Sequence, residues 1–109
     1  MTARYRVLME AKREVITSSE WYETQQAGLG GAFVLDYESI IEHMRKFPET
    51  GSLVTTEVKL RYEIRQFLFN RFKHSLFTVV LPEELVVVAV AHQHRRPGYW
   101  RKRLAKVKP

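Results

Sequence analysis

Side chains that can hold phosphate or carry protons are concentrated in the second half of this chain. Arginine grips phosphate through a planar fork of N–H donors, whereas histidine and tyrosine can exchange protons with a reacting group. The candidates are Lys59, Arg61, Arg65, Arg71, His92, Arg95, Arg96, Tyr99 and Arg101. Such a set is suited to binding a polyanion, and equally to metal-free cleavage of RNA by attack of the 2′-hydroxyl on the adjacent phosphate.

The cleavage interpretation gives four of these residues a chemical role. Arg65 and Arg96 would stabilise the pentacovalent phosphate, while His92 or Tyr99 would carry protons. A purely structural interpretation instead pairs Arg65 with a helix carboxylate and lets His92 close a strand. For any single residue we favour the structural interpretation, whereas for the cluster as a whole we favour binding of an anion or a partner.

The net positive charge of the chain comes from its C-terminal end. The chain carries 18 Lys and Arg against 12 Asp and Glu, which gives a net charge of +6. All 12 acidic residues precede residue 85, and residues 85–109 contain only cations among their charged residues. This asymmetry favours an anionic partner, such as nucleic acid or an acidic protein, as much as a solvated end that keeps the protein soluble. In the binding interpretation, Arg71, Arg95 and Arg101 contact the anionic target.

Other kinds of site lack a sequence signature. His92 and His94 have the spacing of a metal pair on one face of a strand, but no third ligand is near them in sequence, and catalytic zinc sites use three protein ligands. The chain has no cysteine, which excludes disulfides and thiolate chemistry. The segment Gly28-Leu29-Gly30-Gly31 follows a helical pattern instead of a strand, so it predicts a turn and not a phosphate-binding loop. We therefore expect no metal and no cofactor.

The N-terminal half is predicted to contain one strand and two helices. Weak alternation of apolar residues over 5–9 is typical of a strand, and the spacing becomes helical from Ala11. The glycines at 28–31 separate the first helix from a second, which Pro48 ends. The apolar stripe of the second helix consists of Phe33, Tyr37, Ile40, Ile41, Met44 and Phe47.

The C-terminal half is predicted to form a three-stranded meander. After a loop at 49–56, strand-like runs cover 57–69, 75–81 and 85–92, and the last two are joined by a short connection suited to an antiparallel hairpin. The third run is almost entirely apolar, so Val88 and Val90 should be buried in a strand covered on both faces. A short helix is expected at 99–104.

Together these elements predict an α+β fold. The hairpin of helices, residues 11–47, should pack Tyr22 and the apolar stripe of the second helix onto one face of a mainly antiparallel sheet. A length of 109 residues fits a single domain, 1–109. No stretch approaches the roughly 18 apolar residues of a membrane span, and no signal-peptide pattern opens the chain, so we expect a cytoplasmic protein without a membrane partner.

Two motifs resemble those of a known family. The segment Trp21-Tyr22-Glu23-x-Gln25-x-x-Gly28-Leu29-Gly30-x-x-Phe33 is similar to the helical hairpin of the RelE/ParE superfamily, the toxins of type II toxin–antitoxin (plasmid stabilisation) systems. The end of the same toxins resembles the run Val88-Ala89-Val90-Ala91-His92-x-His94-Arg95-Arg96-Pro97-Gly98-Tyr99-Trp100. Arg65, Arg71-Phe72 and residues 76–81 match the middle of the family, so the resemblance spans residues 5–103.

The resemblance implies a toxin that a cognate antitoxin protein neutralises. Its target would be DNA gyrase, poisoned without covalent chemistry as by a ParE-like toxin, or mRNA on the ribosome, cleaved without metal as by a RelE-like toxin. We favour the gyrase-targeting interpretation, because the gyrase-poisoning branch lacks the nuclease set and this chain matches that set only in part. Phe72-Lys73-His74 stands where the family often has Phe-Pro-Tyr, and Thr78 stands where a tyrosine is common. These departures also leave open a degenerate, non-toxic member that binds its antitoxin.

Two expectations concern surfaces. Ile16 and Trp21 fall off the main stripe of the first helix, so we expect them to form an exposed apolar patch that binds the antitoxin. The phosphate-binding and proton-carrying residues should converge on one surface, because the last strands lie side by side and the turn at 95–98 folds back at their end. The expected surface comprises Arg65, Arg71, His92, Arg95, Arg96 and Tyr99.

Overall fold

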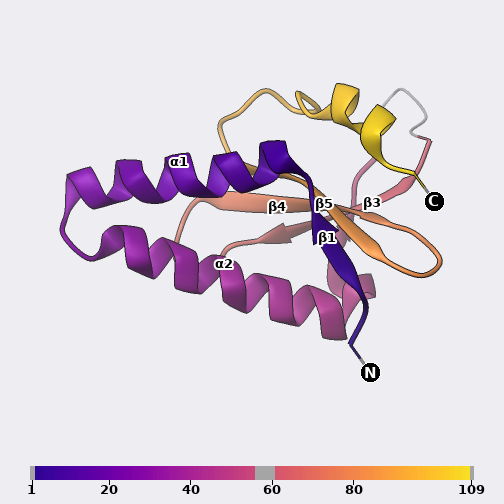
Figure 1. The fold of residues 1–109 in the computed structure, drawn as a ribbon, viewed down its shortest axis with the longest axis horizontal. Helices are drawn as coiled ribbons and strands as arrows, with labels where there is room; N and C mark the ends of the chain where they lie inside the picture. Colours follow the sequence, from indigo (N-terminus) through magenta and orange to yellow (C-terminus); the bar gives the residue numbers. More distant parts are fainter. Residues whose placement is uncertain (1, 56–60, 109) are drawn as a thin grey trace.

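A computed structural model describes residues 2–55 and 61–108 of the chain. A short strand and two long helices form the N-terminal half, and the meander of strands follows them (Figure 1). The elements in chain order are β1 (Tyr5–Val7), α1 (Met9–Gln25), α2 (Leu29–Lys46), the 3₁₀ turn η1 (Pro48–Thr50), β2 (Ser52–Leu53), β3 (Glu63–Leu68), β4 (His74–Val80), β5 (Leu85–His92) and the 3₁₀ helix η2 (Arg101–Lys106).

The strands of the described residues form one five-stranded sheet in the order β1-β5-β4-β3-β2. β1 pairs in parallel with β5, and the other pairings are antiparallel, including the predicted hairpin of β4 and β5. Val88 and Val90 of β5 are 0% and 2% exposed, which confirms that this strand is covered on both faces. The α+β architecture is therefore the one that the apolar patterns predict.

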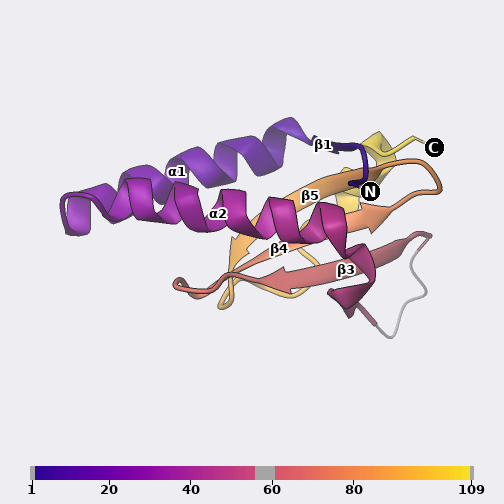
Figure 2. The same ribbon diagram turned by 90° about the horizontal axis from the view of Figure 1, so that it is seen from below.

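The two helices lie side by side on one face of the sheet (Figure 2). Phe33 and Met44 of α2 are fully buried in a core that includes Leu76 of β4 and Val90 of β5. Burying each such side chain contributes about 1.5–3 kcal/mol, so these residues of the predicted stripe hold the helical layer on the sheet. Phe47 was also expected in the stripe, but it lies beyond the end of α2 and is 48% exposed. No helix in the described part of the chain is long and apolar enough to cross a membrane.

The turn between the helices is tighter than expected. Only residues 26–28 separate the helices: Gln26 is extended, Gly28 has φ of 92°, and α2 starts at Leu29 instead of Phe33. The carboxylate of Glu23 accepts hydrogen bonds from the backbone N–H groups of Gly28 and Gly30, both at 3.0 Å, and these bonds lower the pKa of Glu23. Gly30 is needed for close packing, since a Cβ there would lie 2.6 Å from the carbonyl oxygen of Ser19.

The opposite face of the sheet is covered by the C-terminal segment, residues 97–107, here called the C-terminal cover. Trp100 is 1% exposed, and its ring centroid lies 5.2 Å from that of Phe77 on β4. Trp100 and Val107 share a second core with Ile64 of β3 and Val88 of β5. The short helix expected at 99–104 is the 3₁₀ helix η2, which begins two residues later.

Several element boundaries differ from those expected. β1 ends at Val7 and α1 begins at Met9, before Ala11. The expected loop at 49–56 contains η1 and the strand β2, which can pair with β3 because the glycine at 51 lets the backbone approach Phe67 closely. β3 is shorter than the predicted run 57–69, of which residues 57–60 lie outside the described residues.

Candidate functional site

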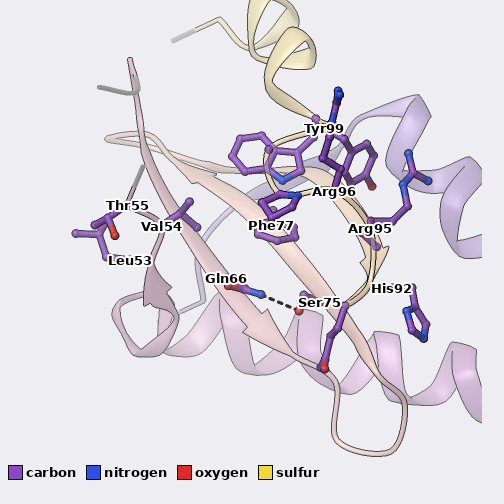
Figure 3. A pocket seen from close by; sticks show the side chains of 15 residues that line it. Leu53, Val54, Thr55, Gln66, Ser75, Phe77, His92, Arg95, Arg96 and Tyr99 are labelled. Atoms are coloured by element: carbon purple, nitrogen blue, oxygen red, sulfur yellow. Dashed lines mark hydrogen bonds between the residues drawn. The ribbon is translucent and has the colours of Figure 1, made fainter. Parts of the chain in front are cut away.

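An open groove of about 400 Å³ lies on the sheet face opposite the helices, beside the C-terminal cover. Figure 3 shows residues 53–55 on one side of it and the turn after β5 on the other. Between them, Gln66 of β3 donates a hydrogen bond from Nε2 to Ser75 Oγ of β4 at 2.9 Å. Leu53 and Phe77 add apolar surface, so the groove combines polar and apolar groups.

The turn after β5 carries the cations of the groove. The backbone N–H of Arg95 bonds to the carbonyl of His92 at 3.0 Å, and the N–H of Tyr99 bonds to the carbonyl of Arg96 at 3.2 Å. Gly98 has φ of 76°, a conformation that favours glycine. The turn presents Arg95 and Arg96, both exposed, at the rim of the groove, and Arg101 borders an adjoining hollow.

Glu14 of α1 anchors this turn and the C-terminal cover to the body of the protein. Its carboxylate accepts hydrogen bonds from Arg103 Nη1 and Nη2 at 2.8 and 3.1 Å and from the backbone N–H of Val90 at 3.0 Å. It also accepts a hydrogen bond from the hydroxyl of Tyr99. The side chains of Glu14 and Arg103 are only 17% and 18% exposed, so solvent screens the pair weakly.

Tyr99 is held by two guanidinium groups and by Glu14. The guanidinium of Arg95 lies 3.9 Å from its ring centroid, and that of Arg103 lies 5.0 Å away. Burial and the hydrogen bond to Glu14 raise the pKa of the Tyr99 hydroxyl well above its usual value. A phenol held in this way is a poor donor or acceptor of protons near neutral pH.

His92 lines the groove but also borders the helical side of the sheet. Its Nδ1 accepts a hydrogen bond from the backbone N–H of His94 at 3.1 Å, and its ring contacts that of the buried His74 with centroids 5.2 Å apart. In Figure 3 the His92 ring points away from Gln66 and Ser75. No group of three His, Asp or Glu side chains that could hold a metal ion occurs in the described ranges.

Arg65 does not join the groove, contrary to the expected convergence. Neighbouring residues of a strand point to opposite faces, and Gln66 faces the groove, so Arg65 points to the helical face. There it bonds to Glu63 on its own strand at 3.0 Å, instead of a helix carboxylate, and to the carbonyl of Gly51 at 3.0 Å. Because Arg65 is one position before Gln66 in β3, it lies on the face of the sheet opposite the predicted surface.

Arg71 also lies away from the groove, in the connection between β3 and β4. Asp36 of α2 is buried and accepts hydrogen bonds from the backbone N–H groups of Asn70 and Arg71 at 3.2 and 2.8 Å. Asp36 thereby fixes the connection and leaves the side chain of Arg71 exposed. Of the six residues expected to converge, the groove collects His92, Arg95, Arg96 and Tyr99.

Ile16 and Trp21 are both exposed on α1, at 56% and 57%. At 100° per residue, five positions separate them by roughly 140° around the helix axis. They are therefore on different flanks and do not form a single patch. Trp21 packs edge-on against Tyr22, with ring centroids 5.0 Å apart.

Three polar residues shape the site without a sequence signal that singles them out. Glu14 lies in a helix with many charged residues, and its partners are distant in the chain. Gln66 and Ser75 belong to predicted strands and acquire their position only through the pairing of β3 with β4. A polar residue inside a strand is the one available clue, and it does not tell which face the residue occupies.

Scans of the sequence against protein-family models and against curated proteins find no match. Among solved structures, the fold is similar to a chain of the chromosomal ParDE TA system from P. aeruginosa, with a TM-score of 0.69 and 13% sequence identity. The likeness covers 84% of this chain and 96% of that chain. This likeness shows a shared fold.

Proposed function

We propose that this chain is the toxin component of a type II toxin–antitoxin module, neutralised in the cytoplasm by a cognate antitoxin protein. The fold shared with a chain of a ParDE system supports this proposal. So do the two motifs that resemble the RelE/ParE superfamily, because they occupy defined places in the fold. The first forms the turn between α1 and α2, and the second forms β5 and the turn beside the groove.

We propose DNA gyrase as the target, bound without covalent chemistry. The observation that carries this choice is the position of Tyr99, whose hydroxyl is engaged by Glu14 instead of being free toward the groove. A metal-free nuclease needs its proton carriers and cations within hydrogen-bond reach of one phosphate. Tyr99 lines the groove with its hydroxyl bound to Glu14, and Arg65 lies on the other face of the sheet, so two of the four candidate nuclease residues are not free to act on a phosphate in the groove.

RNA cleavage remains the second candidate function, because one proton carrier and two cations do meet in the groove. His92, Arg95 and Arg96 all line it, beside the polar pair of Gln66 and Ser75. Thr78, which stands where the family often has a tyrosine, gives RNA cleavage no support. Thr78 is fully buried and its Oγ1 has no hydrogen-bond partner among the described residues.

Controlled expression in a bacterial host distinguishes these functions. After induction, transcript 5′ ends are mapped and plasmid supercoiling is measured in the same cultures. We expect growth arrest, altered supercoiling and no new transcript ends. Co-expression of the antitoxin should restore growth.

New transcript ends that disappear in His92→Ala and Arg96→Ala, but persist in Lys46→Ala, would replace the gyrase proposal by the nuclease. Lys46 is a suitable control because it is exposed at the end of α2, away from the groove. Normal growth without either change would indicate the degenerate member.

A further inference from the structure

Four cations border the groove and its adjoining hollow without an acidic partner in the described part of the chain: Arg95, Arg96, Arg101 and Lys102. Other basic side chains of the C-terminal cover are neutralised, since Arg103 pairs with Glu14 and Lys106 pairs with Glu10. The turn beside the groove and its continuation therefore carry four uncompensated positive charges close together in the chain. Such a patch attracts an anionic ligand.

The charge at the rim is fixed in place before any ligand arrives. Arg95 rests on the ring of Tyr99, and the Tyr99 hydroxyl is bound to Glu14 on α1. A side chain ordered in advance loses less conformational freedom on binding, which favours affinity. Arg95 is therefore suited to hold a carboxylate or phosphate at one defined point.

The groove continues into a second hollow along α1. This hollow, of about 260 Å³, lies between α1 residues such as Thr17 and the end of β5, and it shares Ala91, His92 and Arg95 with the groove. Residues four apart lie on the same flank of a helix, so Trp21 continues the flank that carries Thr17. An exposed path thus runs from Trp21 past Arg95 into the groove.

The lining of the groove suits a peptide better than a nucleic acid. Proteins that bind single-stranded nucleic acid stack the bases on exposed aromatic faces. Here Trp100 is 1% exposed, and the Tyr99 ring has Arg95 and Arg103 against it. The exposed Leu53 and the amide and hydroxyl groups of Gln66 and Ser75 instead match the side chains and backbone of an extended peptide.

We propose that the groove and the adjoining hollow bind an extended acidic segment of the antitoxin. Its carboxylates pair with Arg95 and Arg96, an aliphatic side chain contacts Leu53, and the segment continues toward Trp21. The inference rests on the proposed function only for the identity of the partner. Ile16 lies on the other flank of α1, off this path, which makes it a matched control for Trp21.

The test measures binding of a fluorescein-labelled peptide of alternating Glu and Leu to the purified full chain by anisotropy. We expect saturable binding, and roughly tenfold weaker binding by the double variant Arg95→Gln/Arg96→Gln, because charge-assisted hydrogen bonds are lost. Lys46→Gln, which removes one exposed charge far from the groove, should bind as the wild type does. Circular dichroism of each variant verifies the fold.

Three results would overturn the inference: no binding of the acidic peptide, equal binding of a peptide with Gln in place of Glu, or tighter binding of a short oligouridine with the same dependence on Arg95 and Arg96. The last result would assign the groove to nucleic acid. The binding assay does not depend on growth, so the two proposals can fail separately. If the chain binds the peptide but does not arrest growth, the groove proposal stands and the toxin proposal is refuted. If the chain arrests growth but does not bind the peptide, only the groove proposal is refuted.

Discussion

The carboxylate of Glu14 accepts hydrogen bonds from both terminal nitrogens of Arg103, a residue 89 positions later in the chain. This pair joins the first helix to the C-terminal cover. The same carboxylate accepts hydrogen bonds from the hydroxyl of Tyr99 and from the backbone N–H of Val90, so it also contacts β5. The turn that carries Arg95 and Arg96 is therefore positioned from α1 and not from the sheet alone.

Replacement of Glu14 by glutamine should destabilise the protein by about 3 kcal/mol, because it leaves a largely buried guanidinium without its counter-charge. Chemical denaturation at neutral pH measures the free energy of unfolding. The matched control is Glu10→Gln, which removes the exposed ion pair with Lys106 and should cost less than about 1 kcal/mol. Equal losses in both variants would show that the Glu14 cluster is not an anchor.

Two neighbouring glycines of α2 should respond to alanine with opposite signs. Gly30→Ala is expected to destabilise by about 1–3 kcal/mol, since its Cβ would lie 2.6 Å from a backbone oxygen of α1. Gly31→Ala should stabilise by about 0.5–1 kcal/mol, because no atom lies within 4 Å of its Cβ and alanine favours the helix. Thermal unfolding of the two variants checks this, and the same sign in both would be inconsistent with the described packing of α1 on α2.

The stability of the protein should fall as the pH drops from about 6.5 toward 4, because of His74. Burial, with a smaller effect of His92, lowers the pKa of His74 to about 4. The unfolded chain binds the proton near its ordinary pKa, so acid favours unfolding across this interval by up to roughly 3 kcal/mol. In His74→Phe the slope of unfolding free energy against pH should be markedly smaller. Parallel curves for the two proteins would contradict this role.

The sequence predicted those features that depend on local pattern. The stripe of α2 and the apolar run of β5 identify the two layers, since a one-sided helix and a two-sided strand must cover each other. The position of Arg65 could not be predicted, because a shift of one residue in strand pairing moves a side chain to the other face. β3 is paired on both sides, with β4 over six residues and with the unexpected strand β2 over two, and these pairings place Arg65 on the helical face.

The composition of the groove was predictable only in part, for a related reason. His92, Arg95, Arg96 and Tyr99 are close in sequence, so a single turn brings them together. Glu14 acts on this turn from a distant helix, and nothing in its local sequence distinguishes it from the other acidic residues of α1. Contacts between distant residues depend on packing, which a local pattern does not encode.

Binding of the antitoxin should depend on one flank of α1. Trp21→Glu is expected to weaken the complex by roughly 30-fold, as loss of a tryptophan that contributes strongly to an interface commonly does. Ile16→Glu is equally exposed and should change affinity by less than about threefold, since Ile16 lies on the other flank. Calorimetric titration with purified antitoxin measures both, and equal losses would indicate that the partner spans the outer surface of α1.

The proposal of a gyrase poison is tested most directly by adding the purified chain to a reconstituted gyrase reaction on relaxed plasmid. We expect loss of supercoiling or accumulation of cleaved plasmid, and recovery when antitoxin is added. A parallel reaction measures mRNA cleavage in a translating extract, where we expect intact transcripts. Full supercoiling by gyrase together with cleaved mRNA in the extract would contradict the proposed function.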